Sequence, residues 1–213
     1  MLAIPKSGYY LPNRFGLIFL QAMEDVLGAN GVKATLHIAN LDEWIDNFPA
    51  DDLERNVDFA SFSLLNAALE DIYGARGGRG IARRSAWAMF DRALRHASGV
   101  ASVIDLAIKV LPMRVAVPRG LKALSIAFSK ISDQQASVDI HKESYNFKFQ
   151  RCPSCWGRQS EVPICHSHVG LLEQAAHWMS GGRAFRVQEI RCVARGDEAC
   201  EFQIDKEPIA QLR

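Results

Sequence analysis

The pattern of the chain changes at the stretch Val138-Asp-Ile-His-Lys-Glu-Ser-Tyr-Asn-Phe-Lys-Phe149. Apolar and polar residues alternate before Glu143-Ser144 and again after it, which is typical of two half-buried strands joined by a tight turn. In such a hairpin every second side chain points to the same face, so we expect Tyr145, Phe147 and Phe149 to share one. The stretch therefore predicts a β-hairpin.

Downstream of this hairpin the sequence predicts one helix and a second hairpin. The helix is expected from about Pro163 to Met179, with proline near its first turn and Gly181-Gly182 beyond its end. Two strands, 185–194 and 199–205, follow on either side of the turn 195–198.

The first 133 residues have the apolar spacing of helices. Pro12-Asn13 is a start signal for a helix that is apolar nearly all round until Gly28, and Asp58 can cap a second helix that ends before Gly74. Three more stripes follow, at 86–97, at 103–110 and, after Pro118, at 121–131. Residues 33–39 fit either a short strand or a helical turn.

Together these elements predict an α+β fold in a single domain over residues 1–213. Residues 1–133 are expected to form an N-terminal helical layer. Residues 134–213 are expected to form a small four-stranded antiparallel sheet with a helix between its two hairpins. A chain of 213 residues can bury enough surface to fold without disulfides.

The charge balance argues against a polyelectrolyte partner. Lys plus Arg is 25 and Asp plus Glu is 24, a formal net charge of +1, so direct binding to nucleic acid is not expected. No apolar run is long enough for a membrane span, and no secretion signal is visible at the start. We therefore expect a cytoplasmic protein, in which an odd number of cysteines favours thiols or metal ligands over disulfides.

All five cysteines of the chain lie between Cys152 and Cys200. Cys152-Pro-Ser-Cys155 has a spacing that lets two thiolates reach one metal ion, although redox dithiols use the same spacing. Cysteines can also simply pack in a core, but chance would not cluster all five in this way. The sequence therefore favours a metal site in the last third of the chain.

Three segments carry a resemblance to a known family: Cys165-His-Ser-His-Val-Gly170, Phe185-Arg-Val-Gln-Glu-Ile-Arg-Cys192 and Gly196-Asp-Glu-Ala-Cys-Glu-Phe202. They resemble the vinyl-4-reductase (hydrocarbon-binding) domain, which is related to the sensory domain of aromatic-responsive transcription activators and, more distantly, to subunits of a Golgi tethering complex. The segments Tyr9-Tyr-Leu-Pro-Asn-Arg14 and Tyr73-Gly-Ala-Arg-Gly-Gly-Arg-Gly80 are similar to stand-alone members.

The resemblance implies a zinc ion at the base of a hydrophobic ligand chamber. Its ligand order, Cys, Glu-x-x-Cys, Cys, falls on Cys165, Glu189, Cys192 and Cys200, and a closed set of four such ligands is structural. His166 and His168 are candidates for supporting donors. The pair Cys152/Cys155 departs from the pattern of the sensors. It can replace Glu189 in a four-thiolate site, bind a second ion, or join an iron–sulfur cluster.

A glycine-rich segment between two predicted helices is a candidate anion site. Arg76 and Arg79 lie in it, where backbone N–H groups and guanidinium groups can hold a phosphate or a carboxylate, such as a tetrapyrrole propionate. The alternative is a helix C-cap with solvated arginines. Aromatic residues that can line a ligand chamber, or simply fill the core, are Trp87, Phe90, Phe128, Phe147, Phe149 and Trp156.

These features favour a module that binds an apolar, aromatic or tetrapyrrole-like small molecule and is stapled by zinc. A second hypothesis, which the family name suggests, is a vinyl reductase or an accessory factor in bacteriochlorophyll synthesis, although no hydride-cofactor motif is visible. A third is a redox or iron–sulfur sensor that uses Cys152/Cys155. The all-round apolar first helix, and the pairing of aromatic sensors through their N-terminal parts, further suggest a homodimer.

Overall fold

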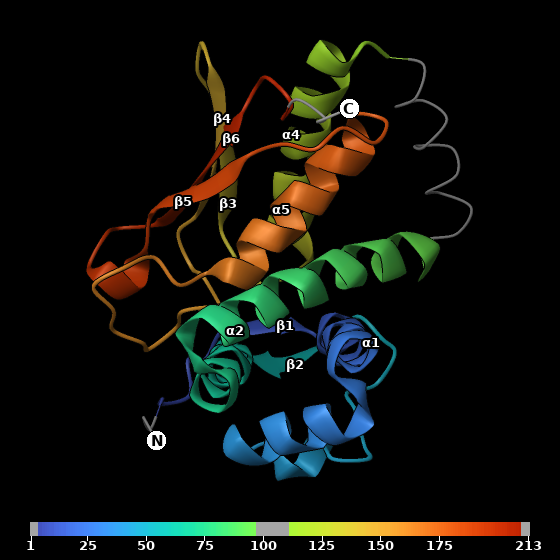
Figure 1. The fold of residues 1–213 in the computed structure, drawn as a ribbon, viewed down its shortest axis with the longest axis vertical. Coiled ribbons are helices and arrows are strands. Elements are labelled where there is room, and N and C mark those ends of the chain that lie inside the picture. Colours follow the sequence, from blue (N-terminus) through green and yellow to red (C-terminus); the bar gives the residue numbers. More distant parts are fainter. Residues whose placement is uncertain (1–3, 97–110, 210–213) are drawn as a thin grey trace.

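The computed structural model describes residues 4–96 and 111–209 (Figure 1). Its strands and helices, in chain order, are β1 (Tyr10–Pro12), α1 (Asn13–Ile38), β2 (Arg55–Asp58), α2 (Phe59–His96), α4 (Met113–Ile131), β3 (Ala136–Ile140), β4 (Ser144–Phe149), α5 (His166–Met179), β5 (Val187–Arg191) and β6 (Cys200–Asp205). Helices thus precede a hairpin, a helix and a second hairpin, as the sequence predicts.

The two predicted hairpins join into one antiparallel sheet of order β3-β4-β6-β5. The first hairpin has Val138 opposite Phe147, and β4 pairs with β6 so that Phe147 lies opposite Phe202. β5 forms the far edge, where the register slips between Glu189 and Arg191. The sheet is therefore built by joining the last strand of each hairpin.

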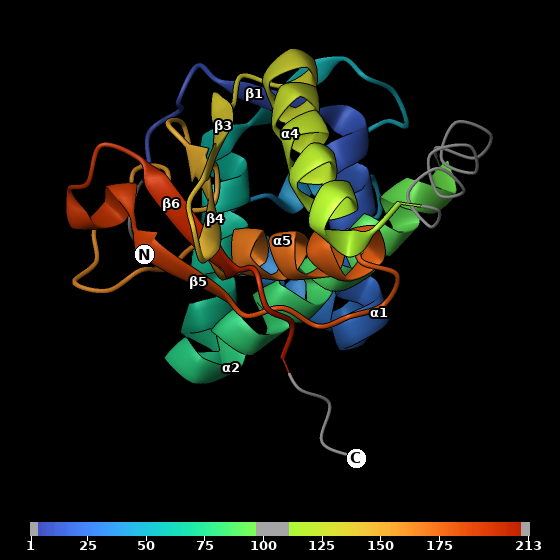
Figure 2. The ribbon, with the colours of Figure 1, turned by 90° about the horizontal axis from the view of Figure 1, so that it is seen from above.

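The faces of this sheet differ in polarity because side chains alternate along each strand. Phe147, Phe149 and Phe202 are fully buried on one face, and Phe128 from α4 packs against that face. α5 also contacts the sheet, so helices cover the apolar side (Figure 2).

The opposite face carries hydrogen bonds and ion pairs between strands. Asn146 donates to Glu201 at 2.6 Å, and Lys148 pairs with Asp139 at 2.6 Å. This alternation confirms the strand assignment made from the period of the sequence.

In the helical half, α1 and α2 pack against each other and both bend at a glycine. Gly74 interrupts α2 with φ +71°, a left-handed conformation that residues with a Cβ rarely adopt, and Gly28 bends α1 in the same way. The predicted helix boundaries at these two glycines are therefore confirmed as kinks. The chain continues as helix beyond each of them.

Several local predictions need correction. Residues 33–39, which were open between strand and helix, belong to α1 as far as Ile38. α4 begins at Met113 rather than after Pro118, because burial of Val117 and Leu121 holds a helix that proline would weaken. The short β1–β2 pairing was not predicted. The apolar stripe at 103–110 and the end of the stripe at 86–97 lie outside the described residues.

Helix α5 crosses α2 at very close range, and this crossing positions the start of α5. A Cβ added to Gly170 would lie 2.2 Å from the carbonyl oxygen of Arg83, so no other residue fits there without moving one helix. The beginning of α5 is thereby fixed beside α2 (Figure 1).

Asp58 caps α2, which gives a first testable prediction. Its carboxylate accepts the N–H of Ala60 at 2.7 Å and two further N–H groups from Ser7 and Gly8. Burial raises the pKa of this carboxyl, but the hydrogen bonds outweigh it, so the pKa lies below its ordinary value. We expect Asp58→Ala to lower the free energy of unfolding by about 1–2 kcal/mol in urea titrations at neutral pH.

The same shift fixes the pH dependence of this prediction. The contribution of Asp58 is fully present above the unfolded-state pKa and is lost as the pH falls through the lower folded-state pKa, so wild type and variant should converge in acid. Asp71→Ala on the exposed side of α2 is the control. An equal loss in both variants would contradict the capping role.

Candidate metal centre

Five cysteines from different segments of the chain meet in one buried centre. Cys152 and Cys155 lie in the loop after β4, Cys165 directly precedes α5, Cys192 directly follows β5, and Cys200 begins β6. All five are free thiols, and none is more than 2% exposed. The centre therefore joins that loop, α5 and the second hairpin.

The sulfur atoms are as close together as the ligands of one metal ion. The Sγ atoms of Cys152 and Cys165 are 3.5 Å apart, as are those of Cys155 and Cys200. Cys165 Sγ lies 3.6 Å from Cys200 Sγ and 3.8 Å from Cys192 Sγ. Thiolates around a tetrahedral zinc with Zn–S bonds of about 2.3 Å stand roughly 3.8 Å apart, so the spacing suits such an ion.

The centre offers two sets of four ligands, and within each set the ligand atoms lie within 4.8 Å of one another. The first is the predicted set Cys165, Glu189, Cys192 and Cys200. The second is Cys152, Cys155, Cys165 and Cys200. The pair Cys152/Cys155 is thus part of the same centre, which the sequence left open.

Glu189 provides a test of whether a cation fits here. Its Oε2 accepts the backbone N–H of Cys165 at 2.8 Å. Its other oxygen, Oε1, is buried and has no hydrogen-bond partner among the described residues. A buried carboxylate oxygen without a partner is costly, and a metal ion would satisfy it.

The protonation of the thiols also favours a cation. Burial raises the pKa of Cys152 to about 12, and burial likewise raises that of Cys165. Hydrogen bonds from Cys152 and its other neighbours hold the pKa of Cys155 below its usual range. So many close thiols cannot all ionise without a positive ion between them, and metal binding would release their protons.

The predicted supporting histidines occupy different positions. Both ring nitrogens of His168 have partners other than the thiols: Nδ1 lies 2.6 Å from Ser154 Oγ, and Nε2 lies 3.1 Å from Gln134 Nε2. Burial lowers the pKa of His168 to about 4, so it is neutral in this network. Nothing in the sequence marked Ser154 and Gln134 as its partners, since they belong to distant segments.

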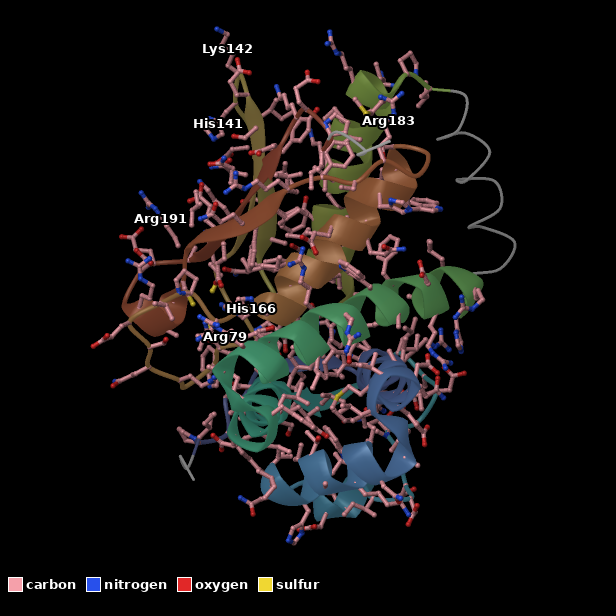
Figure 3. All side chains as sticks on the ribbon, in the orientation of Figure 1. Arg79, His141, Lys142, His166, Arg183 and Arg191 are labelled. Carbon is pink, nitrogen blue, oxygen red and sulfur yellow. The ribbon has the colours of Figure 1, made fainter. Side chains whose placement is uncertain are left out.

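His166, next to Cys165, lies in a positively charged group of side chains (Figure 3). Burial lowers its pKa to about 4, and the charges of Arg79, Arg83 and Arg158 lower it further. Arg158 is 9% exposed and pairs with Glu70 at 3.2 Å. These guanidinium groups place positive charge beside the start of α5 and can balance an anionic thiolate centre.

Residues 146–206, which include this centre, match the model of the vinyl-4-reductase domain family. This part of the chain is a vinyl-4-reductase domain. A 58-residue segment is also 36% identical to an uncharacterized protein of Methanocaldococcus jannaschii, a match that covers 27% of this chain and 32% of that protein. The match thus spans about a third of the relative's length.

The whole fold is similar to that of known sensor domains. The Fe(II) unliganded H-NOX protein from K. algicida is 12% identical, with a TM-score of 0.57 over 95% of this chain and 99% of that chain. The phenol-responsive sensory domain of the transcription activator PoxR, solved with phenol, is 17% identical, with a TM-score of 0.50 over 71% of this chain and 77% of that chain. At these identities the likeness is one of fold.

The residues predicted to line a chamber do not meet in one place. Within the vinyl-4-reductase domain, Phe147 and Phe149 pack directly on Phe128, with ring centroids 6.4 and 5.5 Å away. Aromatic rings therefore fill the space where the sequence suggested a ligand chamber. Phe90 instead packs on Trp178 of α5 at 6.1 Å.

The remaining predicted residues lie around the outside of this domain. Trp156 packs against Tyr9 and Phe59, with ring centroids 5.4 and 6.2 Å away. Arg79 lies beside the metal centre, as described above. Arg76 and Trp87 line a surface groove of about 590 Å³ on the second half of α2.

None of the described helices has both the length and the apolar composition needed to cross a membrane.

The network around His168 gives a second prediction. His168→Ala would leave Ser154 and Gln134 buried without this partner, and such groups cost about 1–3 kcal/mol each. We expect the free energy of unfolding to fall by about 2–4 kcal/mol in urea titrations. His141→Ala, at an exposed position, should change it by less than about 0.5 kcal/mol. Equal effects in the two variants would contradict the network's importance.

Proposed function

We propose that this chain is a small-molecule-binding module of the sensory kind, in which zinc closes the vinyl-4-reductase domain. The observation that carries the proposal is the buried cysteine centre inside such a domain, in a chain with the fold of a phenol-responsive sensory domain. The likeness to H-NOX proteins supports the same kind of role.

Zinc is the metal that this ligand set favours. Thiolates with at most one carboxylate suit zinc, and four protein ligands leave no open position for catalysis. Bound there, the metal would act structurally, holding the loop after β4, the start of α5 and the second hairpin together. An iron–sulfur cluster is the alternative, and visible absorption of the purified protein distinguishes the two, because a zinc–thiolate centre is colourless.

For the ligand, we propose an aromatic molecule that carries an acidic group, bound in the groove on α2. Tyr73 and Trp87 supply aromatic surface, and Arg76 and Arg84 supply positive charge. The indole of Trp87 is held in place because it donates to Glu173 at 3.0 Å. A tetrapyrrole with propionates belongs to this class of ligand, as does a simpler aromatic acid.

The homodimer and the cytoplasmic location remain proposals. Of the apolar side chains on α1 that suggested a dimer, Ile18, Phe19, Leu20 and Met23 are buried by the chain itself, so that helix needs no second subunit to cover it. The support for a dimer is therefore the pairing of related sensors. A centre built from free thiols fits a reducing compartment such as the cytoplasm.

Metal removal gives a third prediction. If free zinc stands at about 1,000 times its dissociation constant, the metal contributes about 4 kcal/mol. Chelation should then lower the melting temperature by roughly 8–16 °C for a chain of this length. Differential scanning fluorimetry with and without a chelator, followed by zinc addition, tests this. A melting temperature that the chelator leaves unchanged, in a protein shown to have lost its metal, would contradict a structural role.

The groove gives a fourth prediction, with protoporphyrin IX as the acidic probe and phenol as the neutral one. We expect Arg76→Ala to weaken protoporphyrin binding about tenfold, since a charge-assisted hydrogen bond contributes about 1.5–3 kcal/mol, and to leave phenol binding unchanged. Trp87→Ala should weaken both probes. Arg195→Ala, away from the groove, is the control for net charge, and calorimetric titration measures all four proteins. Equal binding to wild type and to both groove variants would place the ligand elsewhere.

A further inference from the structure

The metal centre holds more ligands than one ion can use. Its two sets of four share Cys165 and Cys200 and together contain five thiols and one carboxylate. A tetrahedral zinc ion takes four ligands, so a single ion in either set leaves two potential ligands unused. In one case these are Glu189 and Cys192, and in the other Cys152 and Cys155.

Either remainder would be costly in a site as buried as this. An ion in the set of four cysteines leaves Glu189 Oε1 without a partner among the described residues, although the side chain is 6% exposed. An ion in the set with Glu189 leaves two thiols, each at most 2% exposed, at van der Waals distance from bound thiolates. Buried polar groups normally have partners, so a ligand set that uses all six is favoured.

We propose that the centre holds two zinc ions bridged by the thiolates of Cys165 and Cys200. Cys152 and Cys155 complete the first ion, and Glu189 and Cys192 complete the second. The inference rests on the zinc site proposed above and extends it to a binuclear centre.

The distances around Cys165 fit a bridging position. A bridging sulfur must lie beside terminal ligands of both ions. Cys165 Sγ is 3.5 Å from Cys152 Sγ in the first set and 3.8 Å from Cys192 Sγ in the second. The second proposed bridge, Cys200 Sγ, is 3.6 Å away.

Cys200 has the same dual neighbourhood. Its Sγ is 3.5 Å from Cys155 Sγ in the first set, and it belongs to the second set together with Glu189 and Cys192. The backbone N–H of Val193, which follows Cys192, donates to this sulfur at 3.3 Å. Such an N–H supports a sulfur that carries thiolate charge.

The charge of a binuclear centre is also moderate. Five thiolates and one carboxylate carry six negative charges, and two zinc ions would leave about −2, the value of a zinc site with four cysteines. The positive group at Arg79, Arg83 and Arg158, beside His166 and next to Cys165, lies where this charge would be balanced. One ion would leave the same six donors more negative or force protons onto them.

Metal stoichiometry tests the inference directly. Full-length protein, reconstituted with zinc and freed of excess metal, should contain about two zinc ions per chain by elemental analysis. One ion per chain would overturn the binuclear centre and leave the zinc proposal standing. Zinc-free protein that is folded and takes up no zinc would overturn both.

Variants of the terminal ligands separate the two positions. Glu189→Gln and Cys152→Ser should each reduce the content from about two ions to about one, since each removes one terminal ligand and leaves the other set intact. Glu198→Gln, on the exposed turn between β5 and β6, is the matched control and should keep both ions. Loss of all metal from both variants, with the fold retained, would argue for one shared site.

Cobalt titration of the wild-type protein keeps the test independent of whether variants fold. Thiolate-to-cobalt absorption should rise up to two equivalents, and the paramagnetic resonance signal of the first equivalent should weaken as the second binds, because bridging thiolates couple neighbouring ions. Saturation at one equivalent would overturn the proposal. Two equivalents that keep independent signals would overturn the bridges.

Discussion

The structure depends on placing six anionic or potentially anionic groups in one dry site. Five thiols and the carboxylate of Glu189 converge there, and Glu189 has one oxygen with no partner among the described residues. Such a cluster is unstable unless a cation neutralises it or protons occupy it, since desolvation of unpaired charge costs several kcal/mol. The vinyl-4-reductase domain therefore has to be considered together with its metal, because metal binding and folding of this half are coupled.

The rest of the fold holds the ligand-bearing segments at the required distance. Gly170 lets α5 approach the backbone of α2 at Arg83, and this fixes the helix start where Cys165 lies. The same approach brings His166 beside three arginines, so the anionic centre faces a positive layer. The sheet contributes through the pairing of β5 with β6, which brings Glu189, Cys192 and Cys200 together.

This arrangement changes where a ligand is sought. Phe128, Phe147 and Phe149 fill the interface between α4 and the sheet with ring contacts. The groove on α2 offers aromatic surface next to unburied arginines, which suits a flat molecule with an acidic group. Metal and ligand would then act at separate places, the metal by fixing α5 against α2 and the ligand by occupying the outer surface of α2.

The sequence by itself determined the elements and the identity of the metal ligands. The period of two at 138–149, the cap at Asp58 and the glycines 28 and 74 are local signals, and the structure has a strand pair, a helix start and two kinks there. The spacing of Cys165, Glu189, Cys192 and Cys200 is also local to one helix start and one hairpin, so it indicated one four-ligand set in advance.

Only the tertiary structure decided what lies next to what across long separations. It brought Cys152 and Cys155 into the centre, paired His168 with Gln134, and directed Phe90 to Trp178 instead of the sheet. Side-chain type and period say which face of an element is buried, but they carry no information on which distant element covers it. That choice follows from the close packing of α5 on α2 and of β4 on β6, which depends on the shape of the whole chain.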